Sequence, residues 1–305
     1  MILLFYKYVD IQNPEAIRAW QRALCEKLRL TGRIIFAHEG INGTVAGSDE
    51  ACQEYIKIMD SHELFGDIDF KTAQGDATAF PKLKISVKEE IVRLGVDPKK
   101  VTVKDSGQYL TPEQTHHLLQ NPPKNLIIID TRNDYEWAIG RFKNAITPPT
   151  KTFREFPEYV DKNLDAFKDK EVLMYCTGGV RCERATAYVN LKGVAKKVYH
   201  IQGGIQRYTE QYPDGFFRGS NYVFDSRVNI KINDDILSTC ALCTTPWDQY
   251  INCKNALCNK HFLACPACVQ TYNHTCSQNC QTLVLAKQTP ERSLFPEINS
   301  SPNSL

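Results

Sequence analysis

The sequence predicts an α/β protein in three parts: an N-terminal α+β domain, a central domain with a parallel sheet, and a small C-terminal module rich in cysteine. Three observations predict this division. The chain has 305 residues, which suits two or three domains. Strand-like and helix-like patterns alternate over residues 1–95 and again over residues 125–225. Eight of the 12 cysteines fall between Cys240 and Cys280. A hydrophobic content of 42% with 24% charged residues excludes a disordered chain.

Residues 1–95 are expected to form the first domain. Asn13 and Ser48 stand where helix N-caps are needed, and the Asn42-Gly43 step predicts a hairpin turn between two strands. The expected elements are a strand over Ile2–Val9, a helix from Asn13 to about Leu28, a strand pair over 32–45, a helix from Ser48 to about His62, and one or two strands over 67–92. This order suits a ferredoxin-like sandwich.

Residues 96–124 are expected to connect this domain to the next. The segment contains several prolines, and the Thr111–Gln114 pattern is a capping box that predicts a short helix to about Leu119. Residues 125–225 then alternate again. Strands are expected over 125–130, 171–176 and 197–202, with helices between them, which is typical of a parallel sheet covered on both faces.

The most informative segment lies in this central domain. An apolar strand ends at Cys176, Gly178 and Gly179 follow, and a helical pattern begins near Arg181. Such a strand-to-helix turn gathers backbone N–H groups around the sulfur, and the helix N-terminus adds positive potential. Both effects favour a thiolate, so the pattern predicts a nucleophilic cysteine. The alternative is a cysteine that is merely buried at a strand end.

Three further side chains are candidates for the same site. Arg181 and Arg132 are expected to hold an anionic substrate or to stabilise the thiolate; the alternative for both is a structural role, which for Arg132 would be a pair with Glu136 or another carboxylate. Cys182 follows Cys176 by six residues and is expected to resolve a sulfenate or persulfide on it, or else to be a small buried residue.

The loop resembles the active-site loop of rhodanese domains, Cys-x4-Arg. Residues 129–146 agree, because they resemble the rhodanese signature of Asp-x-Arg, then Glu, then Gly-His-Ile-x-Gly-Ala. Arg141 replaces the usual His and Asn144 the usual Gly, changes that should affect packing or the rim of the loop. Phosphatases of this fold have one more residue between Cys and Arg, so four intervening residues favour a sulfur-sized pocket.

The resemblance narrows when three segments are taken together: residues 37–44, residues 176–183 and the cysteine-rich C-terminus. Over about residues 1–285 the chain resembles the bacterial rhodanese-related family of tRNA uridine hydroxylases. The resemblance implies oxygen-dependent 5-hydroxylation of uridine 34 at the tRNA wobble position, with molecular oxygen as co-substrate, the anticodon region as partner and Cys176 as the essential cysteine.

The residues themselves leave the chemistry open. The sequence has no convincing two-His-one-carboxylate set and no Gly-x-Gly-x-x-Gly loop for a flavin or nicotinamide. One hypothesis is that Cys176 adds to C6 of uracil and makes C5 nucleophilic toward an oxidant. Two other functions stay open: a sulfurtransferase that carries a persulfide on Cys176, and a zinc- and RNA-binding adaptor with a vestigial rhodanese core.

The charge of the chain is no argument for nucleic acid, because the formal net charge is only +2. Lys82, Lys84 and Lys88 alternate along an expected strand and would share one face, so Lys82 and Lys84 are candidates to contact phosphates. The alternative is a solvated sheet edge whose lysines prevent strand pairing.

The C-terminal cysteines predict a zinc module over residues 226–285. Two Cys-x2-Cys pairs stand 21 residues apart, and four more cysteines are available to complete a second tetrathiolate. Sequential and interleaved pairings, reduced thiols and disulfides all remain open. The eight candidate ligands are Cys240, Cys243, Cys253, Cys258, Cys265, Cys268, Cys276 and Cys280. Residues 286–305 are expected to form a flexible tail.

The location is expected to be the cytosol. The apolar run at the N-terminus is too short for a signal-peptide core, and no stretch approaches the roughly 20 apolar residues of a membrane span. Clustered cysteines in the cytosol indicate metal or redox chemistry more often than structural disulfides. The sequence does not predict an oligomeric state.

Overall fold

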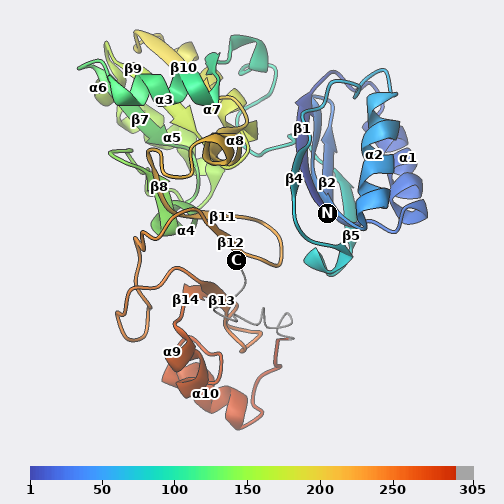
Figure 1. Cartoon of the computed structure of the whole chain (residues 1–305), viewed down its shortest axis with the longest axis vertical. Helices are drawn as coiled ribbons and strands as arrows, with labels where there is room; N and C mark the ends of the chain where they lie inside the picture. Colours follow the sequence, from blue (N-terminus) through green and yellow to red (C-terminus); the bar gives the residue numbers. More distant parts are fainter. Residues whose placement is uncertain (293–305) are drawn as a thin grey trace. The chain divides into compact units, whose positions relative to one another are not determined.

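The computed structural model describes residues 1–292. It divides into two compact units (Figure 1). One unit contains residues 1–137 and 141–217, and the other contains residues 138–140 and the chain from residue 218 onward. No helix in the described part is long and apolar enough to cross a membrane.

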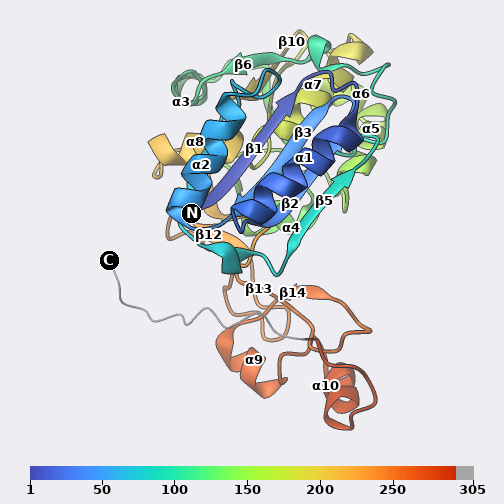
Figure 2. The same ribbon diagram turned by 90° about the vertical axis from the view of Figure 1, so that its right-hand side faces the viewer.

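The N-terminal domain is a five-stranded sheet with two helices on one face (Figures 1 and 2). Its strand order is β4-β1-β3-β2-β5; β5 runs parallel to β2, and the other neighbours are antiparallel. The elements are β1 (Ile2–Tyr8), α1 (Pro14–Lys27), β2 (Thr31–Ala37), β3 (Gly40–Ala46), α2 (Asp49–Asp60), β4 (Lys71–Ala73), a 3-10 turn (Ala77–Ala79) and β5 (Leu83–Val87). The predicted ferredoxin-like arrangement is confirmed, with β5 as an additional edge strand.

Both predicted N-caps are present. The Asn13 side chain accepts a hydrogen bond from the amide of Ala16 at 3.1 Å, and the Ser48 hydroxyl accepts one from the amide of Ala51 at 3.2 Å. Leu3 and Phe5 of β1 are fully buried in the core formed with α1 and α2. Because strand side chains alternate, Leu4 and Tyr6 lie on the opposite face of the sheet.

The hairpin turn differs from the prediction. It consists of His38 and Glu39, since Ala37 pairs with Gly40, and Asn42-Gly43 lies inside β3. Packing explains the glycine: a Cβ on Gly43 would come within 2.6 Å of the Phe5 ring. The Asn-Gly step was therefore a misleading signal, because here the glycine makes room for a core aromatic.

The central domain is built on a parallel sheet with the order β6-β10-β9-β7. Its first strand, β6, lies inside the segment expected to be a connector, 96–124, so that segment supplies an edge strand. The predicted capping box at Thr111 is confirmed. The elements are β6 (Gln108–Leu110), α3 (Pro112–Gln120), β7 (Leu126–Asp130), α4 (Asp134–Ile139), β8 (Gly140–Phe142), α5 (Phe156–Lys162), α6 (Leu164–Phe167), β9 (Glu171–Tyr175), α7 (Val180–Lys192), β10 (Lys197–Ile201) and α8 (Gly204–Gln211), with 3-10 turns at Val103–Asp105 and Phe153–Glu155.

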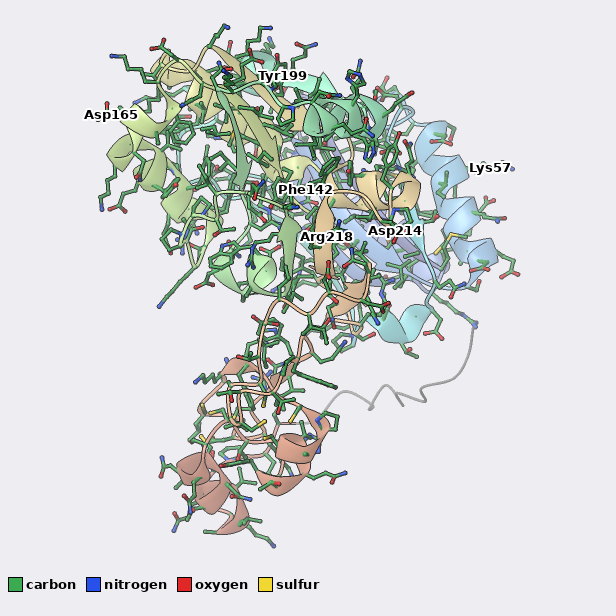
Figure 3. The ribbon with its side chains drawn as sticks, turned by 60° about the vertical axis from the view of Figure 1, so that its left-hand side comes forward. Lys57, Phe142, Asp165, Tyr199, Asp214 and Arg218 are labelled. Carbon is green, nitrogen blue, oxygen red and sulfur yellow. The ribbon has the colours of Figure 1, made fainter. Side chains whose placement is uncertain are left out.

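Helices cover both faces of this sheet, as predicted. Val172 and Met174 of β9 pack against α5 and α7. On the other face, the ring of Phe142 packs between Tyr175 of β9 and Tyr208 of α8, with ring centroids 4.7 and 4.8 Å away (Figure 3). β9 is thus buried on both faces, and at its carboxyl end the chain leaves the sheet and continues to α7.

The second unit is small and has little apolar core apart from cysteine. Its elements are β11 (Phe217–Tyr222), which begins at the unit boundary, β12 (Asn229–Lys231), β13 (Tyr250–Asn252), β14 (His261–Leu263), α9 (Pro266–Thr271) and α10 (Gln278–Leu285). Part of the expected tail 286–305 belongs to this unit: the amide of Arg292 donates to the carbonyl of Lys254 at 2.8 Å. Residues 293–305 lie outside the described residues.

Candidate active site

The site is centred on Cys176, which follows the last residue of β9 and is 1% exposed. The amide of Gly179 donates a hydrogen bond to the Cys176 sulfur at 3.1 Å. Gly179 has a φ of +104°, a conformation that favours glycine, and it caps the N-terminus of α7. The loop therefore directs backbone N–H groups and the positive end of a helix toward the sulfur.

A second glycine turn supports this loop and was missed in the sequence. The amide of Ile205, at the start of α8, donates to the Cys176 carbonyl at 2.9 Å. A Cβ on Gly204 would lie 2.4 Å from that carbonyl oxygen, so only glycine fits. The signal available was the Gly203-Gly204 pair directly after an expected strand.

The surroundings of Cys176 favour its thiolate. Burial alone would raise the pKa of the thiol, but a hydrogen bond from Cys182, the charge of Arg181 and the loop amides outweigh burial and lower the pKa to about 5. Burial and the negative charge of Cys176 raise the pKa of Cys182, which therefore stays a thiol. Cys182 is fully buried, and its sulfur lies 3.6 Å from the Thr131 hydroxyl.

This arrangement predicts the pH dependence of alkylation. Because the thiolate is the nucleophile, the rate of Cys176 carbamidomethylation by iodoacetamide should be at its plateau above about pH 6 and should fall as the pH drops through about 5. An ordinary cysteine would reach half its plateau near pH 8.5. Peptide mass analysis after timed labelling from pH 4 to 9 measures this profile. A midpoint at or above pH 8 for Cys176 would contradict the proposed stabilisation.

Arg181 faces the loop but is held by a carboxylate. Its guanidinium makes two hydrogen bonds to Glu136, at 2.6 and 2.7 Å, and its Nη2 lies 3.5 Å from the Thr177 hydroxyl. Glu136 is fully buried in α4, so this pair fixes the orientation of Arg181. Burial acts to lower the pKa of Arg181, but Glu136 reverses this and raises it, which keeps Arg181 charged beside Cys176.

Arg132 does not line an accessible surface. It is fully buried, and its guanidinium pairs with Asp130 through bonds of 2.7 and 2.9 Å. The expected contact between Arg132 and a substrate is thus not compatible with its position, because the packing around it would have to open. The structural pair left open in the sequence is what the structure contains, with Asp130 as the partner in place of Glu136.

Asn144 explains one departure from the rhodanese signature. Its φ is +63°, in the left-handed region where Asn is tolerated and Gly is preferred. The replacement of the usual Gly by Asn therefore preserves the backbone path without changing the loop around Cys176.

The N-terminal domain completes the site through β1, which the sequence did not reveal. The Tyr6 hydroxyl donates to Glu183 at 3.1 Å, and the Tyr8 hydroxyl donates to the carbonyl of Val180 at 3.2 Å. A Cβ on Gly178 would lie 3.1 Å from Leu4 Cδ2. The sheet face opposite to α1 and α2 is therefore placed, along β1, directly against the Cys176 loop.

Glu183 lies between the two domains. Besides Tyr6, the Tyr109 hydroxyl of β6 also donates to its carboxylate, and burial raises the pKa of Glu183 despite these hydrogen bonds. Glu183 is 3% exposed, and both tyrosine hydroxyls donate to the same carboxylate oxygen, Oε1. Its position in the first turn of α7 makes it a link between the catalytic loop and β1.

A buried ionic cluster fixes α7 to the N-terminal domain. Arg184 is fully buried, lies 2.9 Å from Glu39 and 3.3 Å from Glu90, and donates to the carbonyl of Val96 at 2.7 Å. Glu39 belongs to the β2–β3 turn, and Glu90 follows β5. This cluster holds the start of α7 at a fixed place on the sheet.

Replacing Arg184 by Met should lower the free energy of unfolding by about 3–5 kcal/mol, because Glu39 and Glu90 would be left with no buried cation. Urea denaturation of the full chain measures the loss. Arg22→Met is the control, since Arg22 pairs with Glu26 on the exposed face of α1 and should cost less than about 1 kcal/mol. Equal losses for the two variants would contradict the role assigned to Arg184.

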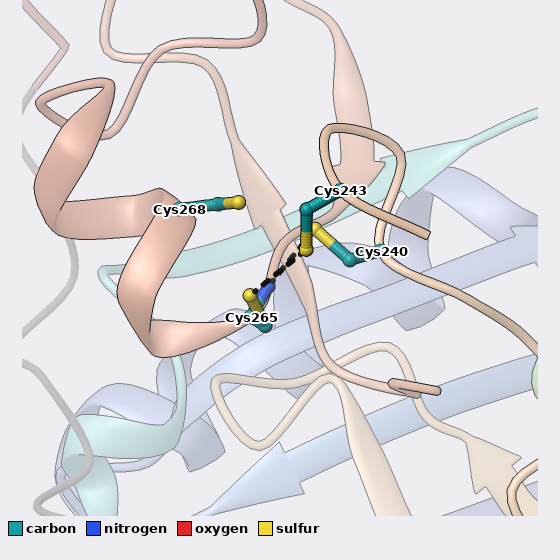
Figure 4. A group of neighbouring side chains, drawn as sticks. All are labelled: Cys240, Cys243, Cys265 and Cys268. Carbon is teal, nitrogen blue, oxygen red and sulfur yellow. Dashed lines mark hydrogen bonds between the residues drawn. The ribbon is translucent and has the colours of Figure 1, made fainter. Parts of the chain in front are cut away.

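The cysteine module contains two groups of four sulfurs. Cys240, Cys243, Cys265 and Cys268 form one group (Figure 4), and Cys253, Cys258, Cys276 and Cys280 form the other. Within each group the sulfur atoms lie within 4.8 Å of one another. Cys243 and Cys265 are 3.6 Å apart, and Cys258 and Cys276 are 3.5 Å apart. All 12 cysteines lie in the described part of the chain, and none forms a disulfide there.

This grouping resolves the pairing that the sequence left open. The two groups alternate along the chain in pairs, so they are interleaved. Both groups consist of cysteines alone, and the nearby histidines His261 and His274 belong to neither. Four thiolates at these separations match the soft, tetrahedral coordination that structural metal sites use. The C-terminal module can therefore hold two metal ions.

Lys82 and Lys84 lie apart from the Cys176 loop, at the far edge of the N-terminal sheet. Lys84 is in β5, while Lys82 precedes this strand and Lys88 follows it; all three side chains are exposed. Of the three, only Lys84 lies within the strand, and phosphate contact by Lys82 and Lys84 stays a prediction.

The fold and the Cys176 loop define a rhodanese-like protein with an added N-terminal domain. Three family models match the chain: a UPF0176 acylphosphatase like domain over residues 1–91, a rhodanese-like domain over 111–211, and a rhodanase C-terminal region over 218–281.

Relatives extend this match to nearly the whole chain. A protein of Cytophaga hutchinsonii named tRNA uridine(34) hydroxylase is 40% identical over 286 residues, covering 92% of this chain and 89% of its own. Proteins of the same name from Acholeplasma laidlawii (39% over 285 residues, 92% and 89% covered) and Streptococcus agalactiae (38% over 290 residues, 92% and 88% covered) agree. The chain belongs to the tRNA uridine(34) hydroxylase family.

Proposed function

We propose that this protein is an oxidoreductase that hydroxylates uridine 34 of tRNA at C5, with molecular oxygen as co-substrate. The observation that carries the proposal is Cys176 as a buried thiolate beneath a sheet face supplied by a second domain. A simple sulfur carrier has no need of that second domain. Relatives named tRNA uridine(34) hydroxylase cover both domains, which supports the same activity here.

The chemistry open to Cys176 is addition to uracil. The thiolate forms a bond to C6, and the C5–C6 electron pair moves toward the C4 carbonyl, so that C5 becomes nucleophilic. C5 then accepts one oxygen atom from O2, and two electrons and two protons from a reductant convert the other atom to water. Loss of the C5 proton restores the double bond and expels the Cys176 thiolate. The products are 5-hydroxyuridine, water and the free enzyme.

Each loop residue has a role in this scheme. The amides of the loop, including that of Gly179, and the Cys182 thiol stabilise the thiolate before attack and after its release. Arg181, oriented by Glu136, supplies positive charge near the sulfur. Gly178 lets the loop pass close to Leu4, since a Cβ there would lie 3.1 Å from Leu4 Cδ2. Arg132 supports the domain without touching the substrate.

The C-terminal module is proposed to bind two zinc ions through its two groups of cysteines. Zinc suits four thiolates, and the small apolar core of this unit gives it little other stabilisation. The ions would hold the module together and take no part in the chemistry at Cys176.

Further parts of the proposal concern organisation and location. The proposed domains are 1–95, 96–124, 125–225 and 226–285, with β6 and α3 counted with the central sheet; the compact second unit begins earlier than proposed, at residue 218. A cytosolic location follows from tRNA as the substrate, and the anticodon arm is the proposed contact.

The test is mass analysis of tRNA nucleosides from cells with and without this protein. Loss of 5-hydroxyuridine and its derivatives in the deletion strain supports hydroxylation. The second candidate function is a sulfurtransferase with a persulfide on Cys176, favoured by the four-residue spacing between Cys176 and Arg181. Loss of thiolated uridine with unchanged 5-hydroxyuridine would support it and contradict the hydroxylase.

A further inference from the structure

The face of the N-terminal sheet opposite to α1 and α2 carries a row of residues that starts at the Cys176 loop. The strand register aligns Leu4 of β1 with Thr44 of β3, Thr44 with Arg33 of β2, and Arg33 with Lys84 of β5. Paired residues of neighbouring strands share a face. Leu4 faces Gly178, so this row leads from the catalytic loop across the sheet to two cations.

The strand register also gives the distances of these residues from β1. Neighbouring strands are about 4.8 Å apart, so Arg33 lies about 10 Å and Lys84 about 14 Å from β1 along the sheet. An adjacent row consists of Tyr6, Asn42, Ile35 and Ser86, which are all uncharged. The cations therefore stand a short distance from Cys176, separated from it by a neutral surface.

Arg33 and Lys84 are not neutralised by the protein. Both side chains are exposed, and within the described part of the chain neither forms an ion pair. No position of the two rows is acidic. Like charges directly opposite each other on neighbouring strands are destabilising, so this pair has a cost that an anion would relieve.

Protection of the sheet edge does not explain the pair. A lysine on an edge strand such as β5 discourages aggregation, which would account for Lys84 alone. Arg33 lies on β2, between β3 and β5, where no free edge exists. An arginine exposed in the middle of a sheet face, next to a lysine, is instead suited to phosphate.

We propose that Arg33 and Lys84 bind the phosphate backbone of a single-stranded RNA loop whose target base reacts at Cys176. The neutral row between these cations and the Cys176 loop is held by the protein itself, because the Tyr6 hydroxyl donates to Glu183 and the Asn42 amide donates to the carbonyl of Ile91. This inference rests on the proposed function for its ligand. It adds the residues that bind the RNA backbone and the direction in which the RNA strand crosses the N-terminal domain.

The experiment compares RNA binding by the full chain and by an R33Q/K84Q variant, using an anticodon stem-loop with uridine at position 34. The variant should bind at least 10-fold more weakly at 100 mM salt. Each phosphate contact in single-stranded nucleic acid contributes about 0.7 to the slope of log affinity against log salt, so the slope should fall by about 1.4.

A matched control removes the same charge from the helical face, as an R22Q/K57Q variant. Lys57 is exposed on α2, on the side of the domain away from the sheet (Figure 3). This variant should keep both affinity and slope nearly unchanged. The urea midpoint and the alkylation rate of Cys176 should be unaltered in both variants, which shows that the fold and the thiolate are intact.

The outcomes separate this inference from the proposed function. Unchanged affinity and slope in R33Q/K84Q, equal losses in both double variants, or no RNA binding by the unmodified chain would each overturn the assigned surface. If R33Q/K84Q loses binding but the unmodified protein forms no 5-hydroxyuridine, the surface stands and the hydroxylase proposal fails.

Discussion

Replacing Cys176 by alanine is expected to reduce 5-hydroxyuridine formation by at least about 1,000-fold, since removal of a nucleophile leaves only binding and positioning. The thiolate is the one group of the site whose surroundings are arranged to activate it: the Gly179 amide, the Cys182 thiol and the Arg181 charge all act on its sulfur. Mass analysis of nucleosides from tRNA incubated with the purified variant measures the product.

Cys25→Ala is the matched control for this prediction. Cys25 is also fully buried, but it packs in the core between the helices and the sheet of the N-terminal domain, where burial raises its pKa to about 12. Its loss should leave the activity within a few-fold of the unmodified protein. C176A should also retain its affinity for the anticodon stem-loop. Full activity in C176A would show that the hydroxylation does not pass through this sulfur.

Local features of the site were predictable because a short stretch of sequence determines them. The turn from β9 to α7 needs the cysteine and both glycines within four positions of the chain. Cys176, Gly178 and Gly179 therefore identify it. The capping residues Ser48 and Thr111 were found for the same reason. Each depends on hydrogen bonds that span only three residues.

Contacts between distant segments were not predictable. Tyr6 approaches Glu183 from 177 positions away, and Arg184 meets Glu39 from 145 positions away. No periodicity in either segment indicates the partner. The Asn42-Gly43 turn failed for a related reason, since the demand for space under Phe5 comes from tertiary packing. The two roles left open for Arg132 could not be separated in the sequence, because its full burial beside Asp130 follows from the fold.

These long-range contacts also explain why the N-terminal domain belongs to the catalytic site. Glu183 and Arg184 are consecutive residues of α7, and each contacts the N-terminal domain: Glu183 through Tyr6, and Arg184 through Glu39 and Glu90. The helix whose N-terminus stabilises the thiolate is thus attached to the sheet that faces the substrate. A displacement of that sheet would disturb both the proposed RNA-binding residues and the electrostatics of Cys176.

The metal content of the C-terminal module should be two zinc ions per chain, and their removal by a strong chelator should unfold the module. Structural zinc contributes about 10–16 kcal/mol in small zinc domains at neutral pH, more than the core of this unit can replace. Loss of helix signal and protease cleavage between residues 240 and 285 would report the unfolding. The central and N-terminal domains have their own cores and should remain protected.

Paired substitutions distinguish the interleaved arrangement from a sequential one. Cys265 and Cys280 belong to different groups in the structure, so C265S/C280S should retain no zinc. In a sequential arrangement the last four cysteines would bind one ion together, and the same variant would keep the other. C265S/C268S is the control, because these residues share a group in both arrangements and one zinc should remain. Elemental analysis of the purified full-length variants measures the zinc, and one ion retained by C265S/C280S would contradict the interleaved pairing.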